Sequence, residues 1–130
     1  MILGIRTDSA TTELYLLDSH GEKLAEDAWE SGRELSVQLH KAIEKLLSKC
    51  SAEYKDLEGV VVFEGPGSFT GLRIGITVAN ALSYSLAIPI AKGGGDEWIA
   101  EAIKSLQESK PGEFVTPHYG GEANITKPRK

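Results

Sequence analysis

Residues 59–75, GVVVFEGPGSFTGLRIG, join an apolar run to a glycine-rich turn that leads into a helical pattern. The run GVVVF at 59–63 is continuous and rich in β-branched residues, as is typical of a strand covered on both faces. The glycines and Pro66 then interrupt the apolar pattern, and a helix is predicted over about 70–86. A strand, a tight turn and a helix in this order indicate an α/β fold.

Three short strands are predicted on the N-terminal side of this stretch: MILGIRT at 1–7, ELYLLD at 13–18 and KLAEDAWE at 23–30. Polar turn signals separate them, DSATT after the first strand and SHGE after the second. Because the connections are short, the three strands are expected to form an antiparallel meander.

The first helix is predicted over 33–49, where apolar side chains recur every three to four residues. Ser31 is expected to cap its N-terminus, and Glu34, three residues later, would complete a capping box. The apolar stripe of this helix consists of Leu35, Leu39, Ile43 and Leu46.

The helix over about 70–86 is apolar on nearly all sides, so we expect the sheet to cover one side and a second surface to cover another. AIPIA at 87–91 predicts a fifth strand, and GGGD at 93–96 predicts a break that ends in an N-cap aspartate. A third helix is predicted over 97–109. Its inward residues are expected to be Ile99, Ala102, Ile103 and Leu106.

These elements predict an α/β domain with a mixed five-stranded sheet and three helices. Right-handed crossovers narrow the topology further, and the ribonuclease-H-like arrangement satisfies them. We expect residues 1–109 to form a single lobe. Residues 110–130, which contain prolines, glycines and lysines, are expected to form a partly disordered C-terminal tail.

The net charge of the 130-residue chain is −5 at pH 7, which argues against autonomous nucleic-acid binding, since that needs a basic face. Cys50 is the single cysteine, so no internal disulfide is expected. The N-terminus does not read as a signal peptide, and no apolar run approaches the ~20 residues that cross a bilayer. We therefore expect a cytoplasmic protein.

The turn at 65–75 has the strand–turn–helix context in which backbone N–H groups bind phosphate. Its spacing fits none of the known motifs. It has no Walker A lysine, Thr70 stands where a dinucleotide loop has its third glycine, and the neighbours of Ser68 break the nucleophile-elbow pattern. Three interpretations stay open: a tight turn, an anion or nucleotide site, and a nucleophile.

In the tight-turn interpretation, Gly65 and Gly67 allow a positive φ, and a hydroxyl at position 68 or 70 caps the helix. Gly71 and Gly75 lie four residues apart, so they would share one side of the helix and let it approach a neighbour closely.

GPGSFTGLRIG closely resembles the signature loop of the TsaB family, also called YeaZ, bacterial proteins required for threonylcarbamoyladenosine modification of tRNA. MILGIRTDSATTELYLLD is similar to the opening strands of the family, and GRELSVQLHKAIEKLL to its first long helix. IPIAKGGGDEWIAEAI and VTPHYGGEANITKPRK resemble the segment after the second helix and the C-terminus. The loop residues that carry the resemblance are Gly65, Pro66, Gly67, Ser68, Phe69, Thr70, Gly71, Leu72, Arg73 and Gly75.

The resemblance implies an actin-like ATPase (ASKHA), ribonuclease-H-like fold and a scaffold role without catalytic residues, metal or cofactor. It implies binding to the catalytic subunit TsaD, which modifies adenosine 37 of tRNA, with the ATPase TsaE joining the assembly. Contact with tRNA would be indirect, and the same helices would form a homodimer when TsaD is absent. The partner interface is expected on the first two helices, at Leu35, Leu39, Ile43, Leu72, Ile76, Ala79 and Ser83.

The sequence departs from the family pattern in two respects. We expect this sequence to form one lobe, whereas members of the family normally have a second. Its first strand ends in Ile5-Arg6-Thr7-Asp8, where the family usually has a sequence like Ile-Asp-Thr-Ser. Arginine thus replaces a carboxylate, which weakens the case for Mg²⁺, and Asp8 is either a turn residue or a substitute ligand.

Two other functions stay open. One is a nucleotide-binding ASKHA-type enzyme, for which Asp8 and Glu64 are the carboxylates near the loop. The other is an orphan lobe that binds some other protein. Arg73, just inside the second helix, is expected to form an ion pair at the surface or between subunits, with a phosphate contact as the alternative.

Overall fold

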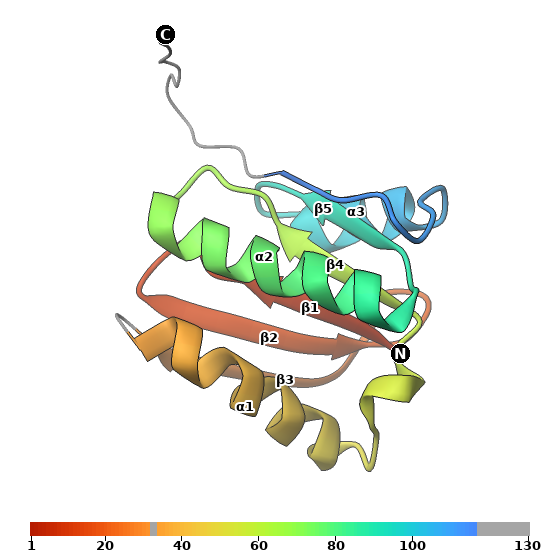
Figure 1. The fold of residues 1–130 in the computed structure, drawn as a ribbon, viewed down its shortest axis with the longest axis horizontal. Coiled ribbons are helices and arrows are strands. Elements are labelled where there is room, and N and C mark those ends of the chain that lie inside the picture. The colour runs from red at the N-terminus through yellow and green to blue at the C-terminus, as the bar shows by residue number, and fades with distance from the viewer. Residues whose placement is uncertain (32–33, 117–130) are drawn as a thin grey trace, which may run out of the picture.

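A five-stranded mixed sheet forms the centre of the fold (Figure 1). The computed structural model describes residues 1–31 and 34–116. The strands are β1 Ile2–Arg6, β2 Thr11–Leu17, β3 Lys23–Glu30, β4 Gly59–Phe63 and β5 Ile90–Gly93. Their order is β3-β2-β1-β4-β5. The first three are antiparallel neighbours, whereas β4 and β5 continue from β1 in parallel. The predicted meander and the predicted mixed sheet are therefore confirmed.

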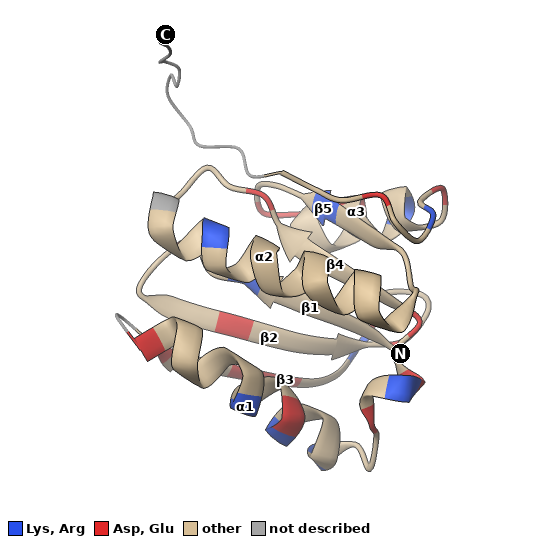
Figure 2. Ribbon diagram, in the orientation of Figure 1, with Lys and Arg blue, Asp and Glu red and all other residues tan. Residues whose placement is uncertain are grey.

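Helices cover both faces of this sheet. In the described residues they are α1 Leu35–Lys49, the 3-10 helix η2 Tyr54–Asp56, α2 Phe69–Leu86 and α3 Trp98–Leu106. α1 packs over β2 and β3, α2 packs beside it over β1 and β4, and α3 covers β4 and β5 from the opposite face (Figure 1). Charged residues are spread over α1, whereas α2 carries a single one, Arg73 (Figure 2).

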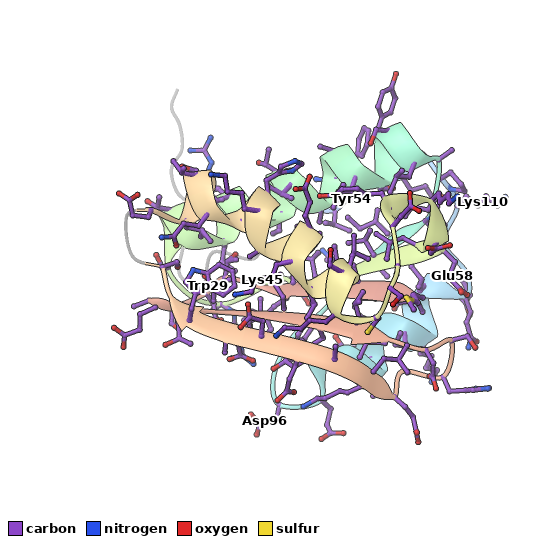
Figure 3. All side chains as sticks on the ribbon, turned by 90° about the horizontal axis from the view of Figure 1, so that it is seen from below. Trp29, Lys45, Tyr54, Glu58, Asp96 and Lys110 are labelled. Atoms are coloured by element: carbon purple, nitrogen blue, oxygen red, sulfur yellow. The ribbon has the colours of Figure 1, made fainter. Side chains whose placement is uncertain are left out.

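The alternation along β4 explains how the two faces are filled. All five residues of this strand are buried, as predicted for a strand covered on both sides. Val60 and Val62 belong to the core under α1 and α2, whereas Val61 and Phe63 belong to the core under α3. Trp29, labelled in Figure 3, belongs to the edge strand β3. Its indole N–H donates to Gln38 Oε1 of α1 at 2.8 Å.

The start of α1 differs from the predicted capping box. Glu34 occupies the N-cap position and no side chain makes a capping hydrogen bond. The hydroxyl of Ser31 instead lies 2.7 Å from the hydroxyl of Thr12, in the buried space beside β2. Because this partner holds the serine against the sheet, its hydroxyl does not serve the helix. The predicted first residue of the helix, at position 33, lies outside the described residues.

β5 and α3 both begin later than predicted. α2 ends in a left-handed cap at Ala87, with a φ of 55°, so the chain reaches the sheet only at Ile90. α3 begins at Trp98, with Glu97 rather than Asp96 at the N-cap and no capping side chain. Asp96 is exposed, and the predicted aspartate cap is therefore wrong.

The segment after α3 has no helix or strand between residues 107 and 116. Asn80 of α2 holds it with two hydrogen bonds: Asn80 Nδ2 donates to the carbonyl of Val115 at 3.1 Å, and the Val115 N–H donates to Asn80 Oδ1 at 3.0 Å. Residues 117–130 lie outside the described part, so the division into a lobe and a tail stays a prediction. No helix in the described ranges is long and apolar enough to cross a membrane.

Candidate functional site

The signature loop, residues 65–75, leaves the end of β4 and enters α2 beside the end of β1 (Figure 1). Gly65 has a φ of 108°, a backbone conformation that favours glycine, as predicted. The Ser68 N–H donates to the carbonyl of Asp8 at 2.9 Å. Ser68 is the N-cap residue of α2, but the predicted side-chain capping bond is not formed. The loop is thus tied to the residues that follow β1.

Three further glycines give the loop its close contact with β1. Gly67 does not need a positive φ, contrary to the prediction, but a Cβ there would lie 2.5 Å from the Cβ of Asp8. A Cβ on Gly71 would lie 2.2 Å from the carbonyl oxygen of Thr7, and one on Gly75 would lie 2.2 Å from Thr7 Oγ1. Thr7 Oγ1 donates to the carbonyl of Gly71 at 2.7 Å. The predicted close approach of the helix is confirmed, and its neighbour is the end of β1.

Ion pairs engage both carboxylates that the sequence places near the loop. Arg6 donates to Asp8 through Nε at 2.8 Å and through Nη2 at 3.3 Å. The hydrogen bond to Asp8 is the main reason why the pKa of Arg6 lies above its ordinary value. Lys92 Nζ lies 3.5 Å from Glu64 Oε1. Asp8 is therefore more than a turn residue, because it is the ion-pair partner of Arg6.

The side chains at the carboxyl end of β1, Arg6 and Asp8, do not fit a metal-bound nucleotide. Ligands in α/β sheets bind beyond the carboxyl ends of the strands, where Arg6 and Asp8 lie, and Mg²⁺ requires oxygen ligands there. The guanidinium of Arg6 already occupies the space beside Asp8. Within the described ranges, no group of three or more His, Cys, Asp and Glu side chains is placed to hold a metal ion.

The residues predicted for the partner interface lie in the core. They belong to the sides of α1 and α2 that pack against the sheet, and none is more than 4% exposed. In this fold these side chains are not accessible to a partner. The buried ones are Leu35, Leu39, Ile43, Leu72, Ile76, Ala79 and Ser83.

The outward sides of α1 and α2 form a second surface, called here the outer helix face. A groove of about 340 Å³ runs along it between the N-terminal halves of the two helices. Val37 on α1 is 66% exposed. The sequence contains a signal for this face on α1, because Val37 is an apolar residue that lies off the predicted stripe of that helix. The groove is lined by Ser36, Thr70, Arg73, Ile74, Thr77 and Val78.

The sheet order, with helices on both faces, defines the class of protein: a lobe of the actin-like, ribonuclease-H-like fold. The family model for TsaD, tRNA N6-adenosine threonylcarbamoyltransferase, matches residues 29–116. YeaZ from Pseudomonas aeruginosa superposes with a TM-score of 0.62 and 26% identity, over 68% of this chain and 41% of that chain.

Curated relatives narrow the class further. The TsaB protein of Bacillus subtilis (strain 168), named a tRNA threonylcarbamoyladenosine biosynthesis protein, is 38% identical over 125 residues, 91% of this chain and 54% of the relative. The tRNA N6-adenosine threonylcarbamoyltransferase of Sulfurimonas denitrificans is 41% identical over 58 residues, 44% of this chain and 18% of the relative. The chain belongs to the TsaB (YeaZ) family. It spans about half the length of the Bacillus relative.

Proposed function

We propose that the chain is a non-catalytic subunit of the tRNA threonylcarbamoyladenosine modification machinery and that it binds a TsaD-type protein. In this role it works in the cytoplasm, where its partner modifies position 37 of tRNA and a TsaE-type ATPase joins the assembly. The chain itself contacts tRNA only through these partners, in keeping with its net charge of −5. Its TsaB relatives are named tRNA threonylcarbamoyladenosine biosynthesis proteins, which supports this role.

The outer helix face is the observation that carries the proposal. α2 has 18 residues but Arg73 is its only charged one, so its outward side offers a surface with few charges to desolvate. Ile74 and Val78 of α2 line the groove, and Val37 is an exposed apolar residue of α1. A protein that lays helices of its own along α1 and α2 would bury these side chains in a helical bundle.

The loop supports the non-catalytic part of the proposal. Asp8 and Glu64, the carboxylates on which an enzyme would depend, are each engaged by a cation of the same chain. Within the described residues, no group of three or more His, Cys, Asp and Glu side chains could hold a metal ion. Calorimetry with Mg·ATP checks this part, and a one-site binding isotherm for the isolated chain would favour the enzyme interpretation instead.

Light scattering after size-exclusion chromatography tests the binding role. The chain, mixed with its cognate TsaD at micromolar concentration, should elute as a heteromer. Thr77→Glu places a charge in the groove, where the partner would have to bury it, so we expect at least about 10-fold weaker association. Ser105→Glu adds the same charge to the exposed side of α3 and should leave association unchanged.

Each other outcome has a defined meaning. A chain that stays separate from TsaD at micromolar concentration contradicts the proposal and favours an orphan lobe with another partner. A homodimer that TsaD displaces, and that Thr77→Glu also weakens, supports the shared use of the outer helix face. Equal effects of Thr77→Glu and Ser105→Glu would contradict the placement of the interface.

A further inference from the structure

Arg6 is held tightly at the carboxyl end of β1. Its Nε and Nη2 both donate to the carboxylate of Asp8, at 2.8 and 3.3 Å, in a forked ion pair. The guanidinium carbon lies 4.0 Å from the centroid of the Phe63 ring, a cation–π contact. Phe63 in turn meets Trp98 of α3 edge-on, with ring centroids 5.8 Å apart. Only 27% of the Arg6 side chain is exposed.

Asp8 connects this cation to the signature loop. Its carbonyl oxygen accepts the hydrogen bond from the Ser68 N–H at 2.9 Å. Its Cβ fills the space that the missing side chain of Gly67 leaves. The orientation of Asp8 therefore sets the path of the loop, and its carboxylate, on a side chain only 16% exposed, depends on a nearby positive charge.

We propose that Arg6 is a positioning residue for the signature loop and that it supplies the positive charge at the carboxyl end of β1. Its guanidinium neutralises Asp8 as a divalent ion neutralises the carboxylates of a metal site. The loop thus keeps its conformation in the chain alone, with neither metal nor nucleotide, and Mg²⁺ has no place beside Asp8. This inference is independent of partner binding.

Amide hydrogen exchange, measured residue by residue by NMR, tests the positioning role. In Arg6→Gln, the Ser68 amide should exchange about 10-fold faster, because the charge-assisted bonds to Asp8 are lost. The Val61 amide in the core should change less than the Ser68 amide. Lys92→Gln breaks the neighbouring ion pair with Glu64 and is the matched control, for which Ser68 protection should stay unchanged.

Divalent ions test the claim that Arg6 takes the place of a metal. Added Mg²⁺ should leave the Ser68 amide of the wild-type chain unaffected. Arg6→Asp puts two carboxylates beside each other, so the loop should open in chelator and regain part of its protection when Mg²⁺ is added. Asp8→Asn combined with Arg6→Asp should abolish this recovery.

Three results would overturn the proposal. The first is an Arg6→Gln variant in which Ser68 and Val61 lose protection equally, since that indicates general destabilisation. The second is a wild-type chain whose Ser68 amide responds to Mg²⁺ in a way that Asp8→Asn removes. The third is an Arg6→Asp variant that folds but gains nothing from Mg²⁺. Arg6→Lys, which keeps the charge but not the fork, should lie between wild type and Arg6→Gln.

Discussion

The two faces of the sheet contact their helices through glycines that lie in different elements, on the helix for α2 and on the strands for α3. On the α2 side the glycines lie on the helix: Gly71 and Gly75 let its backbone meet Thr7, whose hydroxyl donates to Gly71 at 2.7 Å. On the α3 side the helix supplies the large side chain. The Trp98 ring lies over the strand glycine Gly4, 3.6 Å from where the Cβ of that glycine would be.

The contact at Gly71 thus depends on a side chain that is absent from the helix, whereas the contact at Gly4 depends on the ring of Trp98. Close approach also occurs on the α3 side, because a Cβ on the strand glycine Gly93 would lie 2.2 Å from the carbonyl oxygen of Trp98. A methyl group at Gly71 would meet the backbone oxygen of Thr7 at 2.2 Å, and the strand would have to move. A methyl group at Gly4 would meet its neighbours at 3.5 Å or more, which is ordinary contact. Gly71 should therefore be less tolerant of a larger side chain than Gly4, and Trp98 should not tolerate truncation.

Truncation of Trp98 should give the largest effect. Trp98 is 3% exposed and packs against Tyr15 and Phe63, so Trp98→Ala leaves a large cavity and should lower the free energy of unfolding by about 3–5 kcal/mol. Urea denaturation followed by circular dichroism measures this. Tyr84→Ala removes an aromatic ring that is 73% exposed and should cost less than about 0.5 kcal/mol. Similar losses for both variants would refute the contrast between a packed and an exposed ring.

Replacement of the α2 glycines by alanine should give the next largest loss of stability. Gly71→Ala and Gly75→Ala should each lower the free energy of unfolding by about 1–3 kcal/mol, because the added methyl overlaps Thr7. Gly4→Ala adds the same methyl group on the α3 side of the sheet and should change stability by less than about 1 kcal/mol. If Gly4→Ala costs as much as Gly71→Ala, the two contacts do not differ as the distances indicate.

A double-mutant cycle with Thr7→Ala separates the two glycines. Gly75 faces the side chain of Thr7, so Thr7→Ala should relieve much of the loss caused by Gly75→Ala. Gly71 faces the backbone oxygen of Thr7, which the substitution keeps, so the loss caused by Gly71→Ala should persist. Equal relief for both glycines would contradict this assignment of contacts.

The α2 contact was predictable from sequence because the four-residue spacing of Gly71 and Gly75 needs only helix geometry. The strands, the helices and their order followed in the same way from apolar periodicity. The element ends did not, because tertiary contacts decide them. Ser31 fits a capping box in sequence, but in the fold Thr12 engages its hydroxyl. No pattern in the sequence records that pairing.

The candidate interface was less predictable for a physical reason. α2 is apolar on nearly all sides, so its periodicity does not tell which side the sheet buries. In the sequence, the most apolar stripes of α1 and α2, such as the one with Leu39 and Ile43, suggest binding surfaces. Because they are apolar, these stripes pack against the sheet and are buried within the lobe. The outward residues of α2, such as Thr77, can be identified only once the sheet is placed.

The contact between α2 and the segment after α3 should give a smaller effect than the glycine contacts. It depends on hydrogen bonds rather than packing, so Asn80→Ala should lower the free energy of unfolding by about 1–2 kcal/mol. Hydrogen exchange at the Val115 amide should show the change locally. Asn80→Asp keeps the acceptor for that amide and should preserve more of its protection than Asn80→Ala. Equal exchange in both variants would show that the acceptor is not what protects Val115.

Two partly buried tyrosines extend the comparison of the faces to alkaline pH. Tyr15, on the α3 side, has a raised pKa, chiefly because burial disfavours the phenolate and also because its hydroxyl donates to Glu13. Tyr54, from η2 on the α1 side, also has a raised pKa, chiefly through burial (Figure 3). Within the described residues, its buried hydroxyl has no hydrogen-bond partner in the protein. The pKa of Tyr15 is thus raised by a hydrogen bond as well as by burial, whereas the pKa of Tyr54 is raised chiefly by burial.

The pH dependence of stability should therefore arise more from Tyr15 than from Tyr54. A raised pKa means that the folded chain holds the tyrosine proton more tightly than the unfolded chain. The resulting stability is fully present below the ordinary tyrosine pKa of about 10 and is lost as the pH rises through the folded value. Urea denaturation between about pH 8 and 11 should show this loss in the wild-type chain. Tyr15→Phe keeps the ring against Trp98 but has no proton to lose, so it should flatten the decline more than Tyr54→Phe does. A steeper decline in Tyr15→Phe than in Tyr54→Phe would contradict the greater role of the α3 side.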